Sequence, residues 1–300
     1  MEAINIEKFS AVITNMANVM KAAWHIIEEK HPNIVCFRCA SYTLNLLIKD
    51  ILKIHDIKTV IDNATKLVKY FKSHPQALAK LKRIQSDNYK KEIALVLPAI
   101  TRWGTHLECL QSLQKSKVAI EQTLMDSRIR ETIDASLRIY VLCDEFWEDL
   151  DLIASILQPI VTTLKLFESD SATLSSIYSN FRKMLNTIQD ISCNFFDEIQ
   201  TCIEERWNYI YHVIMMVAYM LDPRFLEESR TYNIEAIGYN TFTVFTKQKF
   251  GQEKSVELFI EIVKFRNKSS PYDDFIIWEL NPGIFLLVKL YCFYKLLICI

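Results

Sequence analysis

Glycine and proline are scarce along this chain, and no other feature of the sequence constrains its fold as strongly. The 300 residues include only 4 glycines and 7 prolines. Sandwiches and barrels need such residues at their many turns, so an all-β fold is disfavoured and long helices are favoured. Half of the residues are hydrophobic, which excludes a disordered chain and supplies enough apolar surface for a core.

The charge balance excludes a globally basic DNA-binding protein. Lys and Arg number 35 against 36 Asp and Glu, so the net charge is -1. Any affinity for nucleic acid must therefore come from a local patch. The first seven residues lack the basic start and apolar run of a secretory signal. We therefore expect a reducing intracellular compartment, in which most of the eight cysteines are small core residues.

The first fifty residues differ in pattern from the rest. Residues 9–14 and 34–37 are short, apolar and partly β-branched, which predicts two strands. Apolar residues at helical spacing follow each strand, from Val19 to Ile27 and from Leu44 to Ile51. Strand, helix, strand, helix indicates a βαβα unit with a parallel sheet. Two strands do not form a stable sheet alone, so either further strands lie outside this chain or the prediction is wrong.

Beyond residue 52 the patterns are almost entirely helical. We predict a partial α/β unit at 1–52, a mainly helical domain at 53–280 and an apolar tail at 281–300. Pro159 lies inside one predicted helix and should kink or split it. The stretch 226–250 has no clear period and is expected to be a loop. The predicted helices are 57–73, 76–86, 105–125, 129–142, 144–168, 174–192, 196–221 and 253–266.

Charge is distributed unevenly along the helical part. Residues 53–91 contain ten Lys and Arg against Asp56, Asp62 and Asp87, whereas acidic residues dominate 131–205. A basic part beside an acidic part can give a neutral protein a phosphate-binding face. The alternative is a set of ordinary solvated helix surfaces.

Two short motifs have a chemical and a structural interpretation. Cys36 and Cys39 form a single CxxC without the second ligand pair that zinc needs, so structural, metal and redox roles are all open. In Thr101-Arg102-Trp103-Gly104, Arg102 can pair with a phosphate and Trp103 can stack on an unpaired base. The alternative is a Trp buried at a helix entry beside an Arg paired with an acid. The sequence lacks a glycine-rich phosphate loop, a GxSxG elbow and an HExxH motif.

Six stretches of the chain form one pattern when they are taken together in their order and approximate separation. They are 12–18, 38–47, 101–103, 157–160, 168–174 and 220–225. This pattern resembles the hAT superfamily of DNA transposases, which combines an RNase H-like core with a large helical insertion and performs metal-dependent DNA transposition. The resemblance implies a mainly α fold with a small α/β part: an incomplete RNase H-like βαβα unit followed by a large α-helical insertion-type domain.

The family's catalytic residues do not transfer to this chain. Where the family has an Asp after its strand, this chain has Asn15, and where the family has a His after its Cys, this chain has Tyr42 following Cys39. The family's first acid precedes the residues present here, and its last acid follows them. Active relatives use Mg²⁺, but we expect no catalytic residue, no metal site, no cofactor and no enzyme activity here. The positions that do transfer are Arg102 and Trp103, which the resemblance implies handle DNA in the nucleus.

The apolar run 284–300 and the overall role each have more than one interpretation. The run predicts a cut-off dimerisation segment, and therefore self-association, but a buried terminal helix and a membrane anchor are alternatives. A membrane partner is not expected, because the run is short and contains Lys289 and Lys295. We predict a transposase-derived, inactive protein with residual DNA binding. The alternatives are a helical protein-interaction module without a nucleic-acid role and an active metal-dependent nuclease.

Overall fold

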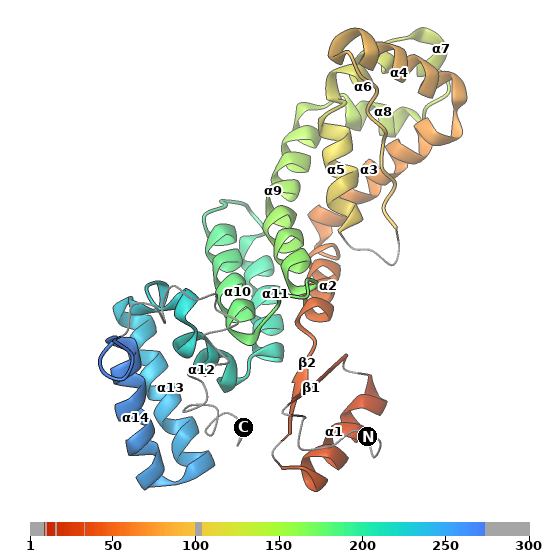
Figure 1. The fold of residues 1–300 in the computed structure, drawn as a ribbon. Helices are drawn as coiled ribbons and strands as arrows, with labels where there is room; N and C mark the ends of the chain where they lie inside the picture. Colours follow the sequence, from red (N-terminus) through yellow and green to blue (C-terminus); the bar gives the residue numbers. More distant parts are fainter. Residues whose placement is uncertain (1–8, 10, 16, 33, 100–103, 274–300) are drawn as a thin grey trace. The chain divides into compact units, whose positions relative to one another are not determined.

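Helices dominate the structure, and its described part contains one small sheet. The computed structural model describes residues 9–273 apart from 10, 16, 33 and 100–103 (Figure 1). This architecture confirms the predicted mainly α class with a small α/β part, while the tail 284–300 lies outside the described residues. The elements are β1 (Ala11–Thr14), α1 (Asn18–Lys30), β2 (Val35–Arg38), α2 (Ala40–Ile51), α3 (His55–Ser73), α4 (Pro75–Tyr89), α5 (Thr105–Gln114), α6 (Lys117–Leu124), α7 (Ser127–Arg130), α8 (Ala135–Val141), α9 (Asp144–Phe167), α10 (Leu174–Gln189), α11 (Phe196–Ile210), α12 (Val213–Leu221), the 3₁₀ turns η2 (Pro223–Phe225) and η3 (Glu228–Arg230), α13 (Tyr232–Phe250) and α14 (Gln252–Arg266).

The two predicted strands form a parallel pair. β1 and β2 run in register, so that Thr14 lies beside Arg38 at the carboxyl ends of the strands. β2 buries Cys36 and Phe37, whereas the side chains of β1 are half-buried or exposed. α1 connects the strands and contacts β2. The βαβα order predicted for the first fifty residues is therefore confirmed.

Spatial contacts group the described residues into two compact units. Unit 1 comprises the described parts of 1–43, 167–183 and 207–300, and unit 2 comprises those of 44–166 and 184–206. The boundaries fall inside α2, α10 and α11 and at the last residue of α9, so each of these helices contributes residues to both units. The domain boundaries predicted after residues 52 and 280 are boundaries along the sequence. A grouping of residues by spatial contact does not test them, so they stay predictions.

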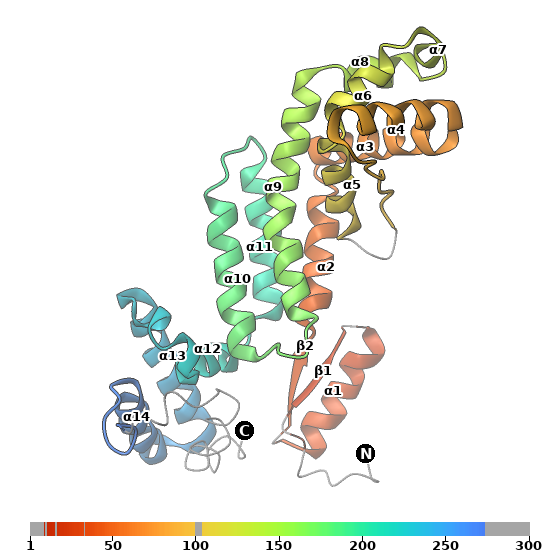
Figure 2. The same cartoon turned by 45° about the horizontal axis from the view of Figure 1, so that its top comes forward.

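Unit 2 is a set of helices packed through apolar stripes. Ile57, Ala64, Leu67 and Phe71 lie on one side of α3 and have no exposed surface, while the lysines of α3 lie on the other side. α3 contacts α4, α5 and α8, and α4 contacts α6 (Figure 2). The helix predicted at 105–125 is two helices, α5 and α6, which are separated at Lys115 and Ser116.

Pro159 does not split α9, contrary to one of the two outcomes predicted for it. The helix runs without interruption from Asp144 to Phe167. Leu157 and Ile160, on either side of the proline, are buried, so packing outweighs the roughly 3 kcal/mol that an interior proline costs. By length and composition alone α9 could cross a membrane, but 56% of its apolar window is buried within the protein, as in a core helix.

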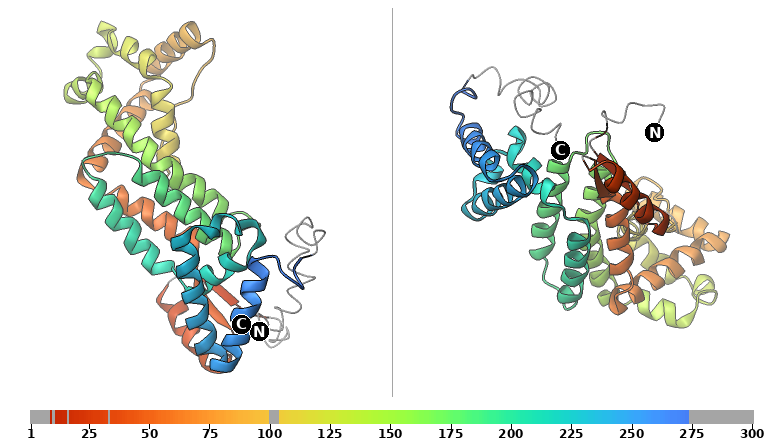
Figure 3. Two further views of the ribbon diagram at one scale, coloured as in Figure 1. Left: turned by 90° about the vertical axis from the view of Figure 1, so that its left-hand side faces the viewer. Right: turned by 90° about the horizontal axis from the view of Figure 1, so that it is seen from below.

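Residues 226–250 are mostly helical, and the expected loop is wrong. They contain η3 and α13 (Figure 3). α13 contacts both α12 and α14, so its apolar side chains are not confined to one stripe and the sequence shows no clear period. The helix predicted at 196–221 is likewise two helices, because His212 begins α12 by accepting a hydrogen bond at Nδ1 from the Ile214 N–H (3.2 Å).

Gly238 sets the distance between α12 and α13. A methyl group at this position would lie 2.8 Å from Cε and 2.9 Å from Cγ of Met220, and closer still to its Sδ. Met220 has no exposed surface and therefore little room to move. The close packing of the two helices consequently requires a residue without a side chain.

We expect Gly238→Ala to destabilise unit 1. Overpacking costs typically about 1–3 kcal/mol, which exceeds the roughly 1 kcal/mol that Ala gains over Gly inside a helix. Urea unfolding followed by circular dichroism should show a lower midpoint. Gly104→Ala is the matched control, because its methyl group would meet Val161 Cγ1 at an ordinary 3.4 Å. Equal or greater stability of Gly238→Ala would contradict this account of the packing.

Candidate functional site

The carboxyl end of β1 is where the resemblance places a metal-binding acid. Asn15 follows the strand with an exposed amide side chain. Thr14, the last residue of the strand, makes two structural hydrogen bonds. Its carbonyl oxygen accepts one from the Cys39 N–H (2.9 Å), and its hydroxyl oxygen accepts one from Trp24 Nε1 (3.0 Å). The bond from Cys39 joins the stretches 12–18 and 38–47, and the bond from Trp24 ties the end of β1 to α1.

The neighbouring strand end carries a cation rather than a carboxylate. The Arg38 guanidinium lies 4.3 Å from the centroid of the Tyr209 ring, and its Nη1 donates to the Tyr209 carbonyl oxygen near the end of α11. Within the described residues, no group of three or more His, Cys, Asp or Glu side chains is placed to hold a metal. A neutral amide after one strand and a cation at the end of the next do not fit Mg²⁺, which prefers carboxylate oxygens and is repelled by a positive charge.

The CxxC pair also lies at this end of the sheet. Cys36 is buried in β2, and the Sγ atom of Cys39 lies 3.1 Å from the hydroxyl oxygen of Ser41. Both thiols are free. Burial, and to a smaller extent the Glu28 carboxylate, raises the pKa of the Cys36 thiol. Metal ligation and redox attack both need the thiolate, so this environment favours the structural interpretation of the pair.

His212 packs against the same part of unit 1, where its ring contacts a residue of β2. Its ring meets Phe37 edge-on with the centroids 5.2 Å apart. Burial lowers the pKa of His212 below its ordinary value of about 6.5, against a smaller raising effect of Glu28. The neutral ring is the form that can accept the hydrogen bond from the Ile214 N–H, and protonation would also place a positive charge at a helix N-terminus.

We expect the stability of the protein to fall as the pH drops below about 6.5, the ordinary pKa of His. The folded pKa of His212 is the lower one, so the unfolded chain takes up the proton first and unfolding becomes easier. His212→Asn keeps a cap that accepts a hydrogen bond but cannot titrate. Urea unfolding at pH 7.5 and 5.5 should therefore show a smaller loss for the variant. An identical loss in both proteins would rule out His212 as the cause.

The lysines predicted to form a basic face divide into two groups. Four make ion pairs: Lys53 with Asp50 (2.7 Å), Lys58 with Asp62, Lys80 with Asp126 (3.2 Å) and Lys82 with Glu92 (2.8 Å). The others, which we call the unpaired cations, make no ion pair with any described carboxylate. They are exposed and comprise Lys66, Lys69, Lys72, Arg83, Lys90 and Lys91.

The unpaired cations differ in their surroundings. Asp134, whose pKa is lowered mainly by a hydrogen bond from Ser136, also feels the charge of Lys66. Lys90 Nζ donates to the Asp87 carbonyl oxygen (3.2 Å), which leaves its charge unbalanced. Lys69 and Lys72 lie one helical turn apart on the outer side of α3. These exposed charges are available to an anion in solution.

Arg102 and Trp103, the predicted nucleic-acid-binding residues, lie outside the described residues, and the structure places neither. The described chain on each side is held firmly. Gln85 has no exposed surface; its amide donates to the Ile93 carbonyl oxygen (3.1 Å) and the Ser116 hydroxyl (2.9 Å) and accepts from the Ile93 N–H (3.0 Å). Further along, the Val96 N–H donates to Ser112 Oγ (3.0 Å) and the Ala99 N–H to Thr105 Oγ1 (2.8 Å).

An unpaired cation lies close to the helix that follows the Arg102-Trp103 motif. Burial raises the pKa of Cys109 on α5 to about 12, and the charge of Lys72 opposes this rise. Lys72 therefore lies within electrostatic reach of a residue only six positions beyond Trp103. The sequence identified both the lysines and the motif, but it gave no sign that α3 and α5 pack together.

The stretches 168–174 and 220–225 also meet in the structure. Asp222, 5% exposed, accepts hydrogen bonds from Ser175 Oγ (2.6 Å) and from the Arg224 guanidinium (2.6 Å). Arg224 in turn donates to Thr173 Oγ1 (3.1 Å). Asp222 also begins η2 by accepting from the Arg224 N–H (3.0 Å). This buried network shows that the two stretches have a structural role, which sequence reasoning had not assigned to them.

Comparisons with known proteins identify three relationships. Residues 1–67 match a family described as a domain of unknown function, DUF659. Residues 37–156 match the ZBED1 RNase-like helical domain. The chain is also similar to the human zinc finger BED domain-containing protein 4, with 24% identity over 166 residues. That similarity covers 55% of this chain but only 13% of the human protein.

Proposed function

We propose, from the premise that this chain is a hAT transposase-derived protein, that it is catalytically inactive and binds DNA without sequence preference. The observation that carries the binding is the group of unpaired cations between residues 66 and 91, in a chain whose net charge is -1. Lys53, Lys58 and Lys82 differ from this group, because each of them is paired with a carboxylate. We place this activity in the nucleus, and self-association remains a further proposal.

The inactivity follows from the chemistry at the strand ends. Metal-dependent phosphoryl transfer needs carboxylates that hold divalent ions against the attacking and leaving oxygens. Asn15 offers a neutral amide oxygen, and Arg38 on the adjacent strand places a positive charge near the same edge. Both features weaken cation binding, so we propose that neither Mg²⁺ nor Mn²⁺ is held there productively.

Purified full-length protein should not cleave supercoiled plasmid DNA in Mg²⁺ or Mn²⁺. Asn15→Asp should be equally inactive, because a single carboxylate beside Arg38 does not make a metal site. Agarose gels over several hours provide the measurement, with protein-free reactions containing each metal as the control. Metal-dependent nicking by the wild-type protein, lost on chelation, would establish the active-nuclease alternative in place of this proposal.

The binding we propose is to the phosphate backbone. Lys and Arg side chains release condensed counterions when they contact phosphates, so affinity falls steeply with salt. Lys69, Lys72 and Arg83 are exposed and have no carboxylate partner in the described part of the chain, so they can make such contacts without breaking an ion pair. Arg102 and Trp103 would add a phosphate contact and a stacking surface.

We expect Lys69→Ala, Lys72→Ala and Arg83→Ala together to weaken DNA binding strongly. Each lost phosphate contact removes roughly 0.9 from the slope of log K against log salt, so the triple variant should lose about 2.7. Gel shifts or fluorescence anisotropy with a labelled duplex from 50 to 300 mM NaCl would measure it. The matched control replaces Lys53, Lys58 and Lys82, whose charges are already paired, and should lose much less.

Two outcomes of this experiment would count against the proposal. Absence of wild-type binding even at 50 mM NaCl would remove the DNA claim, and equal losses in the two triple variants would show that the unpaired cations are not the contact. Arg102→Ala with Trp103→Ala tests the motif separately. We expect that double variant to bind single-stranded DNA more weakly, because stacking on an aromatic ring contributes about 1–3 kcal/mol per base.

A further inference from the structure

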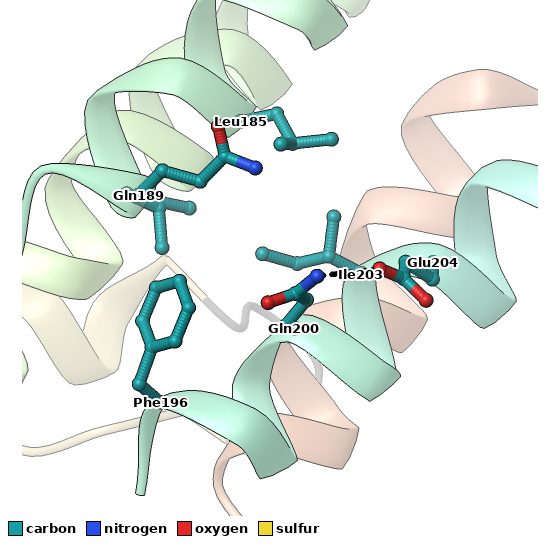
Figure 4. A pocket seen from close by; sticks show the side chains of 7 residues that line it. Leu185, Gln189, Phe196, Gln200, Ile203 and Glu204 are labelled. Carbon is teal, nitrogen blue, oxygen red and sulfur yellow. Dashed lines mark hydrogen bonds between the residues drawn. The ribbon is translucent and has the colours of Figure 1, made fainter. Parts of the chain in front are cut away.

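An open apolar crevice lies between α10 and α11 in unit 2. Its apolar walls are Leu185 and Ile188 from α10 and Phe196 and Ile203 from α11 (Figure 4). The free space is about 250 Å³, part of which is open to solvent. Small-molecule sites are usually enclosed clefts, whereas this crevice is partly open to solvent. An open apolar hollow of this kind is a surface that a larger partner can cover.

Polar side chains form the rim of the crevice. Gln189 lies on the α10 side, and Gln200 and Glu204 lie on the α11 side (Figure 4). Gln200 Nε2 donates to Glu204 Oε1 (2.7 Å), which holds the carboxylate beside the opening. Asp197 is seven residues before Glu204 and therefore lies on the same face of α11. The apolar floor is thus bordered by negative charge along one helix.

The segment that contains the crevice carries negative charges that no nearby positive charge balances. Residues 184–205 contain no Lys or Arg. Their acidic residues are all exposed, and none makes an ion pair with a cation in the part of the chain that the structure describes; they are Asp190, Asp197, Glu198, Glu204 and Glu205. The next cation along the chain, Arg206, is paired with Asp50. This pattern contrasts with the ion pairs that balance Lys53, Lys58 and Lys82 elsewhere in unit 2.

We propose that the α10–α11 crevice binds a basic amphipathic helix from a partner protein. An apolar side chain of the partner enters between Leu185 and Phe196, and Lys or Arg residues one turn away pair with Asp197 and Glu204. Grooves between helices commonly bind amphipathic helices in this way, through apolar residues at helical spacing. Charge complementarity selects a basic partner and disfavours an acidic one. The site is separate from the unpaired cations, so it does not depend on the proposed DNA binding.

Anisotropy with labelled model peptides tests the proposal on the full chain. The probe is a 14-residue amphipathic helix of Leu and Lys. One comparison peptide has Ser in place of Leu at the same charge, and another has Glu in place of Lys. We expect the Leu/Lys peptide to bind and both comparison peptides to bind at least about tenfold more weakly, because each lacks one of the two complementary features.

Charge-reversal variants locate the binding. Asp197→Lys with Glu204→Lys should raise Kd for the Leu/Lys peptide about tenfold, since both changes reverse charges at the rim. Glu145→Lys with Glu148→Lys makes the same charge change on the exposed acidic surface of α9 and should have little effect. All four positions are exposed, and circular dichroism melts would confirm that both double variants fold.

Several results would overturn the proposal. Failure of the Leu/Lys peptide to bind at low salt would remove it. Equal binding of the Ser/Lys peptide would show that the apolar crevice has no role, and equal losses in the two double variants would show non-specific attraction to acidic surfaces. Sedimentation that shows self-association abolished by Asp197→Lys with Glu204→Lys would identify a second copy of the chain, and not a basic partner, as the occupant.

Discussion

The burial of one apolar stripe on each long helix is the constraint on which the rest of the structure depends. Ile57, Ala64, Leu67 and Phe71 on α3 have no exposed surface, and α9 buries its apolar residues in the same unit. Each Ile, Leu or Phe among them contributes on the order of 1.5–3 kcal/mol when it is fully buried. The same constraint directs the remaining side chains outward. The lysines of α3 and the acids of α11 are exposed because the opposite faces of their helices are needed for packing.

Buried polar groups complete this packing by fixing segments that have no regular structure. Gln85 satisfies both the N–H and the carbonyl of Ile93, a half-buried residue in the segment between α4 and α5. Asp222 does the same at η2, and Arg266, 1% exposed, donates to Glu235 and to the Met220 carbonyl oxygen. Leaving such groups unpaired costs about 1–3 kcal/mol each, so these bonds select one arrangement of the chain. Two of the stretches that resemble hAT transposases, 168–174 and 220–225, are joined by such a network.

Sequence patterns predicted the regular elements well and the irregular ones poorly. The strands of the α/β part, α3, α9 and α14 were predicted within a few residues, because the type and spacing of their apolar residues are visible in the local sequence. α13 was missed, since its contacts with both α12 and α14 disperse its apolar residues. The breaks at Ser116 and Tyr211 were also missed, because single caps such as His212 depend on geometry rather than on composition. For the candidate site, the Lys58–Asp62 pair follows from i, i+4 spacing, whereas Lys80–Asp126 joins distant segments and needed the fold.

The sequence alone determined the mainly helical class, the βαβα start and the presence of an amide, Asn15, after the first strand, because composition, period and residue identity are local properties. Only the tertiary structure decided which cations remain without a carboxylate, that Arg38 lies beside the end of β1, and that Leu185 and Phe196 form a crevice within an acidic surface. These properties depend on distances between residues far apart in the chain. Such distances are set by how the helices pack, and the linear pattern of residues does not contain them.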